Sequence, residues 1–425
     1  MAKPPFTAAR DWFRRHPFDA GFLVGAAVSL ALYLFIAQGG FPLASRLKTR
    51  EHYYTAEAIG LLHGRLWVPK QALTFECFMD RGHCYGYFGI TPTLLRVPVV
   101  TLFGPGVKTD ITEFAYFTLG FCLIAAAAWW LSRQLVVLWA AEPAGRPFGI
   151  AGVVAGFAGL GATPLIFLAS RPTVYEEAIL WGVAFALIAL AAALSFCRRP
   201  RWSMAVVLVV ADALGILARP TVGATGLVAT GVLALWMLID AGRRRTGRGA
   251  KVVEALRRPA LVAVFLIAGA GVAAVSASAV SILKFHTVSP PYRDQLLLLG
   301  RASRIAPFTH FAGVNGAVIP THLLSTMLPK ALKLVAGRPY VLLGEYRPIA
   351  VWPAHRADLV WEPTSSVPDA LPFSLLGLLG GLGVVVAAGW RAGVLRARAA
   401  RRRDRNPALE GSALVMASAL AALVA

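Results

Sequence analysis

Long apolar runs alternate with short polar segments along almost the whole chain. Nine of these runs contain about 17 to 25 mostly apolar residues, the length that lets an α-helix cross the hydrocarbon core of a bilayer. We therefore expect an all-α, polytopic integral membrane protein with about nine transmembrane helices. The predicted spans are Phe18–Ala37, Glu113–Leu131, Phe148–Ala169, Ala178–Phe196, Ser203–Ala218, Thr221–Ile239, Ala260–Leu283, Ala370–Ala388 and Ala408–Ala425.

The composition agrees with this pattern. The 425 residues are 57% hydrophobic and only 15% charged, whereas about a quarter of the residues in soluble globular domains are charged. An ordinary water-soluble fold is therefore excluded. The net charge of +21 would suggest a nucleic-acid partner in a soluble protein, but in a membrane protein it first reports orientation.

Basic residues are concentrated in the segments between alternate runs. The segments 1–17, 132–147, 197–202, 240–259 and 389–407 hold 23 of the 42 Lys and Arg residues and 5 of the 21 acidic ones, a net charge of +18. Such an excess marks cytoplasmic segments. We therefore expect a cytoplasmic N-terminus (1–17), followed by a membrane domain (18–425) with outer segments 38–112, 170–177, 219–220 and 284–369.

This orientation decides how a tenth apolar stretch, Thr91–Phe103, is interpreted. It is short and contains Arg96, and counting it as a span would invert every later basic segment. We interpret it as a helix that lies on or dips into the outer face. The Ala-, Arg- and Gly-rich composition favours a bacterial inner membrane. The last run stops at the final residue without flanking charge, so we expect the native chain to continue beyond residue 425.

Charged residues at the outer ends of the spans are the strongest indication of a functional site, because charges at bilayer depth are costly and tend to face a cavity or one another. Arg219 and Lys284 end spans there, and Glu176 and Glu177 lie in a short outer turn. Each has a plainer explanation, since basic side chains at span ends commonly extend to the headgroups. Asp212, inside the fifth run, is interpreted equally well as a structural partner, and we leave it out of the predicted site.

Carboxylates beside cations at the lipid–water boundary suit the transfer of a group from a lipid phosphate to a hydroxyl. The carboxylate would act as general base on the acceptor, and Arg or Lys would neutralise the departing phosphate. A phosphate leaves readily as an anion, so this chemistry requires no acid for the leaving group.

The pattern resembles the C superfamily of polytopic membrane glycosyltransferases (GT-C fold), whose first span is followed by a long outer loop that opens with acidic residues, a Tyr and an Ala. Glu51, Tyr54 and Ala58 have that spacing, and Tyr85–Pro92 is similar to the aromatic-Pro segment that precedes a surface helix in the family. Family members also carry acids between spans three and four. Arg50 departs from the pattern, because many members have an Asp there.

The resemblance implies inverting transfer of a sugar from a polyprenyl-phosphate donor to an envelope glycan, lipid or protein acceptor. It implies Glu51 as the base, with Glu176 or Glu177 orienting the acceptor or a divalent cation such as Mg or Mn, held by Glu51 and Glu176. The predicted phosphate ligands are Arg171, Arg219 and Lys284, and the predicted substrate-binding residues are His52, Tyr54, Tyr85, Tyr87 and Arg293.

Two cysteines in the first outer segment predict a disulfide. Cys77 and Cys84 flank alternating aromatic residues around an Asp-Arg-Gly turn, which predicts a β-hairpin. On the oxidising side of the membrane the pair favours a disulfide. A metal site with His83 is the alternative, although it leaves a tetrahedral zinc ion one ligand short.

The last outer segment predicts an amphipathic stretch over Thr321–Ala336 that lies at the interface. Its aromatic and basic residues fit either a carbohydrate-binding wall or an aromatic belt.

Two other classes of protein remain open. A transporter or lipid flippase would place polar groups near the midplane, on broken helices, and Asp212 points in that direction. A non-catalytic member of an envelope assembly complex is the other alternative. All three predict contact with membrane lipid and none predicts a nucleic-acid partner.

Overall fold

The computed structural model describes residues 12, 13, 15–38, 52–73, 77–104, 109–139, 146–161, 163, 165–170, 173–244, 250–288, 332–334 and 341–343. The described residues are mostly helical. The long helices are α2 (Pro17–Gln38), α5 (Thr109–Trp139), α6 (Arg146–Leu160), α8 (Val174–Arg198), α9 (Trp202–Ala218), α10 (Pro220–Arg244) and α11 (Ala250–Phe285). Shorter elements are α3 (Tyr53–Leu62), η1 (Lys70–Ala72), α4 (Thr91–Phe103), α7 (Leu165–Ser170), β1 (Phe78–Asp80), β2 (His83–Tyr85), β3 (Leu332–Leu334) and β4 (Val341–Leu343).

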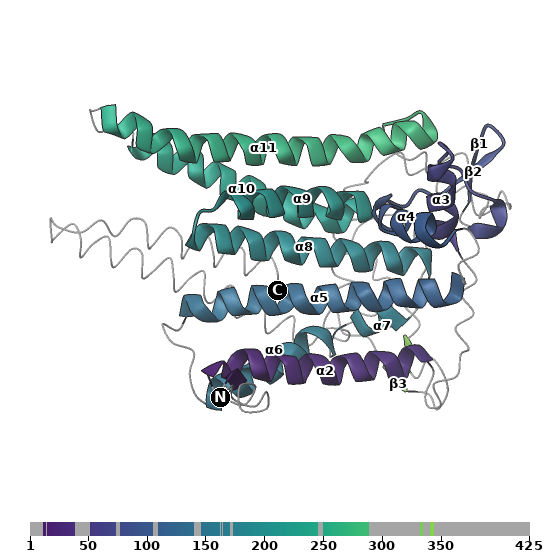
Figure 1. The fold of residues 1–425 in the computed structure, drawn as a ribbon, viewed down its shortest axis with the longest axis horizontal. Helices are drawn as coiled ribbons and strands as arrows, with labels where there is room; N and C mark the ends of the chain where they lie inside the picture. The colour runs from purple at the N-terminus through teal and green to yellow at the C-terminus, as the bar shows by residue number, and fades with distance from the viewer. Residues whose placement is uncertain are drawn as a thin grey trace, which may run out of the picture.

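The long helices lie roughly parallel in one bundle, and α3, α4 and the β1–β2 hairpin gather at one end of it (Figure 1). We call this the hairpin end. The opposite end, which carries Arg133 and Arg198, is the basic end. The segments predicted to lie outside the membrane, where the structure describes them, are at the hairpin end. The charge pattern therefore correctly grouped these described segments at one end of the bundle.

Among the described residues, five helices are long and apolar enough to cross a membrane. They are Pro17–Ala37, Glu113–Val137, Val174–Arg198, Pro220–Ile239 and Ala260–Phe285. Each coincides with a predicted span. The predicted span Ser203–Ala218 corresponds to Trp202–Ala218, a continuous but shorter apolar helix. The predicted spans Ala370–Ala388 and Ala408–Ala425 lie outside the described residues.

One predicted span is wrong as a single helix. The run Phe148–Ala169 is divided into α6, which ends at Leu160, and α7, which begins at Leu165. The sequence places Gly161 and Pro164 in the interruption. Proline disfavours a helical conformation in the residue before it and lacks the N–H that a continuing helix uses. An apolar run alone therefore overestimated the length of this helix.

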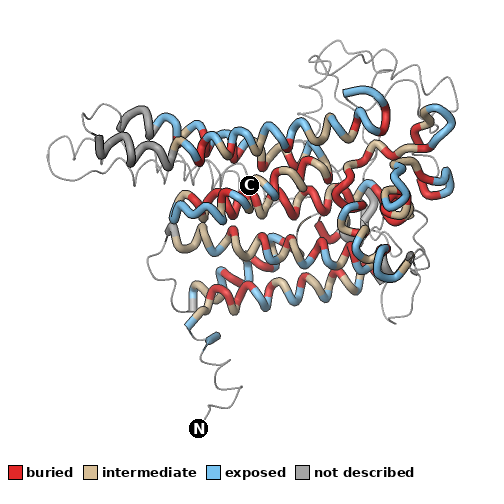
Figure 2. Tube along the Cα trace, turned by 45° about the horizontal axis from the view of Figure 1, so that its top comes forward, coloured by how far each residue is buried: buried red, intermediate tan, exposed pale blue. Residues whose placement is uncertain are grey.

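Helix α8 lies at the centre of the bundle. In its most apolar window 72% of residues are buried, compared with 22% in α11. Figure 2 shows the same contrast, with many exposed residues along α11 at the edge of the bundle and more buried residues on the helices inside it. The exposed side chains on α11 include Leu261, Val264, Val272 and Val275. A helix that is apolar on its outward face suits contact with lipid tails rather than water.

Helices α2 and α6 pack closely through glycines. A Cβ on Gly21 or Gly25 would overlap the backbone of α6, and a Cβ on Gly152 or Gly156 would overlap the backbone of α2. Small residues at such positions let transmembrane helix backbones approach each other, which strengthens van der Waals packing.

Replacing Gly156 by valine is expected to destabilise the protein by about 1 to 3 kcal/mol, because the added methyls meet backbone that cannot move aside. Gly159→Val is the matched control on the same helix, since a Cβ there meets nothing within 4 Å. Melting temperatures of the detergent-purified variants measure the difference. Equal melting temperatures would contradict the packing described here.

The predicted hairpin and disulfide are both present. Strands β1 and β2 pair antiparallel, with Met79 opposite Cys84, and the turn uses Arg81 and Gly82 at positive φ. Cys77 and Cys84 form a disulfide with an S–S distance of 2.09 Å. Their sulfurs are therefore bonded to each other, and the alternative of a zinc site at His83 loses its two thiolates.

The amphipathic stretch predicted for Thr321–Ala336 lies mostly outside the described residues. Where the structure does describe it, Leu332–Leu334 is a strand that pairs antiparallel with Val341–Leu343. Leu332–Leu334 within the stretch is therefore a strand, and its location at the interface stays a prediction. Leucines can supply a short strand because cross-strand pairing overrides intrinsic propensity.

Candidate functional site

Helix α3 holds the first of the predicted outer segments against the bundle. Its buried face carries Tyr53, Tyr54, Glu57 and Ala58, which recur at the three- and four-residue spacing of one helix face. The Tyr54 hydroxyl donates to the carbonyl of Val174 at the start of α8, with an O···O distance of 3.1 Å. A segment far from α8 in the sequence is thereby fixed to the end of the central helix.

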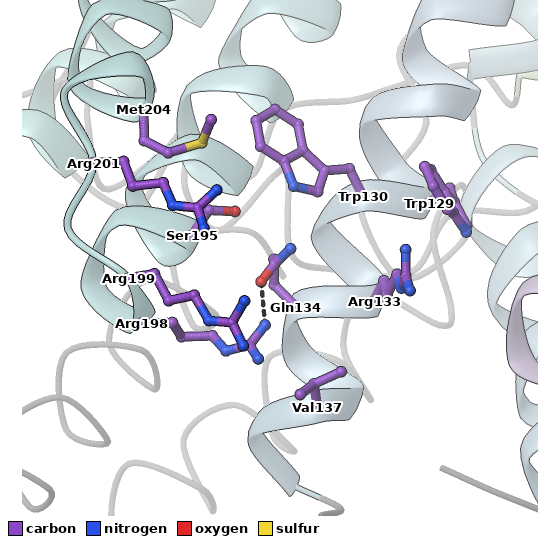
Figure 3. Close-up of a pocket in the computed structure, with 10 residues that line it drawn as sticks. All are labelled: Trp129, Trp130, Arg133, Gln134, Val137, Ser195, Arg198, Arg199, Arg201 and Met204. Atoms are coloured by element: carbon purple, nitrogen blue, oxygen red, sulfur yellow. Dashed lines mark hydrogen bonds between the residues drawn. The ribbon is translucent and has the colours of Figure 1, made fainter. Parts of the chain in front are cut away.

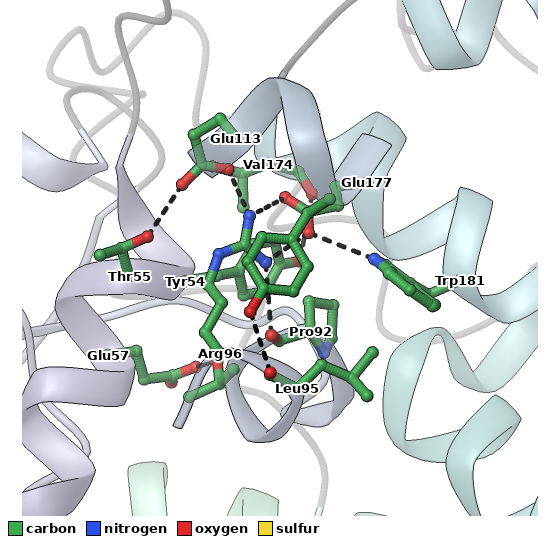
Figure 4. A network of polar contacts seen from close by, with 12 residues as sticks. Tyr54, Thr55, Glu57, Pro92, Leu95, Arg96, Glu113, Val174, Glu177 and Trp181 are labelled. Carbon is green, nitrogen blue, oxygen red and sulfur yellow. Dashed lines mark hydrogen bonds and ion pairs between the residues drawn. The ribbon is translucent and has the colours of Figure 1, made fainter. Parts of the chain in front are cut away.

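A buried guanidinium joins α4, α5 and α8. Arg96 donates two hydrogen bonds to the Glu177 carboxylate, at 2.5 and 2.9 Å, and one to Glu113 (Figure 4). Thr55 of α3 donates to Glu113 at 3.0 Å, and the Trp181 indole donates to Glu177 at 3.3 Å. We call these five residues the Arg96 network. It ties together four helices at the hairpin end.

The charges in this network stabilise one another. Burial alone would lower the pKa of Arg96, but Glu177 and Glu113 raise it above its usual value. The guanidinium carbon also lies 4.2 Å from the ring centroid of Tyr116, a cation–π distance. Two carboxylates surround one cation, so the Arg96 network carries a net negative charge while all three groups are ionised.

A second buried ion pair joins α3 to α11. Lys284 Nζ lies 2.6 Å from Glu57 Oε1, and the two side chains are 1% and 0% exposed. Tyr53 donates to the same carboxylate oxygen at 2.5 Å, and Thr93 of α4 donates to the other. The ammonium also donates to Tyr53 Oη at 3.0 Å and to the carbonyls of Gly86 and Phe88 at 3.2 Å. Glu57, Lys284, Tyr53 and Thr93 form the Glu57 network.

The same network affects the protonation of its tyrosine. Burial raises the pKa of Tyr53 well above its usual value, and the negative charge of Glu57 raises it further. The hydroxyl therefore stays protonated and donates a hydrogen bond to the carboxylate. Lys284 was predicted as a phosphate ligand, but in the structure its ammonium is enclosed and bound by protein acceptors.

Arg219 ends α9 and faces aromatic rings. Its guanidinium carbon lies 4.4 Å from the Tyr175 centroid and 5.9 Å from the Tyr87 centroid. Phe88 packs on both tyrosines, at centroid distances of 6.2 and 4.2 Å. Within the described residues Arg219 forms no ion pair with a carboxylate, and its side chain is only partly buried. We call Arg219, Tyr87 and Tyr175 the Arg219 cluster.

The other predicted site residues have different positions. Glu176 is partly exposed in the first turn of α8, whereas Glu177 is buried in the Arg96 network. His52 precedes α3 and is partly buried, and Tyr85 packs its ring 5.9 Å from Phe285. The predicted residues Glu51, Arg171 and Arg293 lie outside the described residues.

The sequence analysis missed three charged residues of these networks as site members. Arg96 was used only to argue against a span, Glu113 only to begin one, and Glu57 not at all. A usable signal was present, because each is a charge within an otherwise apolar segment and such charges pair with one another. The sequence did not reveal their partners, since Arg96 and Glu177 are 81 residues apart.

The acids in the described residues do not gather into a metal site. No group of three or more His, Cys, Asp or Glu side chains in this part of the chain could hold a metal ion. The expected cation between Glu51 and Glu176 depends on Glu51, which lies outside the described residues.

Thr230 of α10 donates to Asp212 Oδ2 at 2.5 Å, which ties α9 to α10 inside the bundle.

No family model, no curated protein and no solved structure matches this chain.

Proposed function

We propose that this chain is a membrane glycosyltransferase that transfers a sugar from a polyprenyl-phosphate donor to an envelope glycan, lipid or protein on the outer face of a bacterial inner membrane. In this proposal the hairpin end faces outward. The observation that carries the proposal is the convergence of buried ion pairs from α3, α4, α5, α8 and α11 at that end, beside the Arg219 cluster.

The buried networks support a positioning role rather than a chemical one. Glu57 and Glu177 are enclosed and bound by Lys284 and Arg96, so neither carboxylate is available to take a proton from an acceptor. What they supply is rigidity, because a reacting group must be held within fractions of an ångström to be effective. Helix α3 is consequently held in a fixed position at the hairpin end.

Glu51 is the proposed general base. It precedes Tyr53 by two residues, and two residues of extended chain reach at most about 7 Å. Tyr53 is anchored in the Glu57 network, so a described residue two positions after Glu51 belongs to the hairpin end. Glu176, partly exposed at the start of α8, is the proposed acid that orients the acceptor or a divalent cation.

Arg219 is the proposed ligand of the donor phosphate. Its guanidinium lies against aromatic rings and forms no ion pair with a carboxylate among the described residues, and its N–H groups suit a bidentate contact with phosphate oxygens. In the reaction the acceptor hydroxyl gives its proton to Glu51 and its oxygen bonds to the anomeric carbon. The bond from that carbon to the phosphate oxygen breaks, and polyprenyl phosphate leaves with the electron pair.

Replacing Glu51 by glutamine is expected to lower transfer at least about 100-fold, because a general base contributes about that factor or more. The substitution keeps the shape of the side chain, so the melting temperature should not change. Mass spectrometry of envelope glycans from a deletion strain complemented with either form measures the effect. The matched control is Glu76→Gln, an acid in the same outer segment to which we assign no role.

The outcomes separate the candidate functions. Wild-type glycans in the Glu51→Gln strain would remove this residue from the mechanism, and unchanged glycans in the deletion strain would reject the proposal. The transporter or flippase alternative is favoured by one observation, the buried Asp212 inside α9, whose Oδ1 has no hydrogen-bond partner among the described residues. It would be supported if Asp212→Asn, and not Glu51→Gln, abolished function.

A further inference from the structure

A cavity of about 510 Å³ lies at the basic end, far from the Arg219 cluster. Helix α5 forms one wall, and the end of α8, the turn after it and the start of α9 form the other (Figure 3). Pockets that bind small ligands have about this volume. The lining residues are Trp129, Trp130, Arg133, Gln134, Val137, Ser195, Arg198, Arg199, Arg201 and Met204.

Four of the ten lining residues are arginines and none is acidic. Arg198, Arg199 and Arg201 are exposed side chains, and Arg198 donates to Gln134 at 2.5 Å. Figure 3 shows the side chains of Arg199 and Arg201 directed toward Gln134 across the cavity. Among the described residues, only Arg133 of the four arginines forms an ion pair, with Asp19 at 3.7 Å. Within this part of the chain the other three arginines therefore leave the cavity with an excess of positive charge.

A polar group in the cavity wall also lacks a partner. Ser195 Oγ is buried and makes no hydrogen bond among the described residues. A buried hydroxyl that is left unsatisfied costs free energy, so a ligand oxygen at this position would relieve the cost. The arginines and the hydroxyl together select an anion with several oxygen acceptors, which is the chemistry of a phosphate.

The level of the cavity in the bundle indicates where this phosphate comes from. Arg198 ends the apolar span of α8, and the exposed Trp202 begins the apolar helix α9. Tryptophans and arginines at such positions mark the boundary between hydrocarbon and headgroups. Trp130, Val137 and Met204 supply apolar lining beside the arginines. The acyl chains of a lipid can contact this apolar lining, whereas a soluble anion has no apolar part that would do so.

We propose that this cavity binds the phosphate headgroup of an anionic phospholipid, with Arg198, Arg199, Arg201 and Arg133 as its cationic ligands and Ser195 as a hydrogen-bond donor. The basic end would face the cytoplasm, where basic pockets between transmembrane helices bind anionic headgroups. The site is separate from the proposed transferase site and does not depend on it.

Native mass spectrometry of the full chain in detergent tests the proposal directly. Phosphatidylglycerol is titrated against phosphatidylcholine of the same acyl chains, and we expect the anionic lipid to bind at least 10-fold more tightly. Arg199→Gln/Arg201→Gln should weaken phosphatidylglycerol binding about 30-fold, since each basic residue near a headgroup contributes about a fivefold factor. Arg199→Lys/Arg201→Lys retains the charge and should lose less.

The matched control removes two basic residues from the other end of the molecule. Arg65 and Lys70 are exposed at the hairpin end, and Arg65→Gln/Lys70→Gln should leave phosphatidylglycerol binding unchanged. Equal losses in the two double variants would mean that net charge, not this cavity, attracts the lipid. Unchanged binding in Arg199→Gln/Arg201→Gln would also overturn the proposal. Displacement of the lipid by millimolar inorganic phosphate would instead assign the cavity to a soluble anion.

Discussion

Replacing Arg96 by methionine is expected to be among the most damaging single substitutions at the hairpin end. The change leaves Glu113 and Glu177 enclosed next to each other without the cation between them. Removing one partner of a buried ion pair typically costs about 3 to 5 kcal/mol, because the remaining charge is uncompensated. Loss of the stacking on Tyr116 adds to this. The melting temperature of detergent-purified protein measures the effect.

Three further variants identify the cause. Arg96→Lys keeps the charge but cannot contact two carboxylates as a planar fork, so it should be intermediate. Arg96→Met combined with Glu113→Gln and Glu177→Gln removes all three charges and should regain much of the lost stability. Arg65→Met, at an exposed position on the same end, should change stability by less than about 1 kcal/mol. A wild-type melting temperature for Arg96→Met would refute the structural role of the Arg96 network.

The second large effect is expected at Lys284. Lys284→Met leaves the fully buried Glu57 without its cation and also removes the hydrogen bonds that the ammonium donates to the carbonyls of Gly86 and Phe88. We expect a loss of stability of about 3 to 5 kcal/mol. Glu57→Gln should also destabilise, because it leaves the buried ammonium without a counter-charge. Thermal unfolding in detergent measures both.

A double-mutant cycle isolates the pair itself. Lys284→Met with Glu57→Gln should cost less than the sum of the single changes, by on the order of 2 kcal/mol, as is typical for residues in contact. His286→Asn is the control, at the residue that follows α11, because His286 is exposed and asparagine tolerates its φ of 57°. Strictly additive effects of Lys284→Met and Glu57→Gln would show that the two side chains do not stabilise each other.

The sequence predicted the presence of the described long helices better than the residues at which they begin and end. Phe18–Ala37 differs from α2 by one residue at each end, because the apolar run stops where the helix stops. Glu113–Leu131 is shorter than α5, which continues past Arg133 to Trp139, since a helix need not end where its apolar stretch ends. The division of the apolar run into α6 and α7 was missed because hydropathy does not include the loss of a backbone N–H donor at a proline such as Pro164.

The candidate site was predicted only as a region. Glu177, Arg219 and Lys284 are at one end of the bundle, as the distribution of charge indicated. Their contacts could not be predicted from the sequence, because each depends on which helix faces are neighbours. Arg219 faces tyrosines, whereas Lys284 pairs with an acid from a helix that no sequence signal placed beside it.

The bond between Lys284 and Tyr53 sets an order for the assembly of the protein during synthesis. The two residues are 231 positions apart, and ribosomes add about 5 to 20 residues per second. The first outer segment must therefore wait about 10 to 50 seconds before the ammonium that completes it has been made. During that interval Glu57 has no cation from α11, and the segment is most exposed to proteases and open to chaperones. Assembly of the hairpin end is consequently a late event, although its first residues are among the earliest to be synthesised.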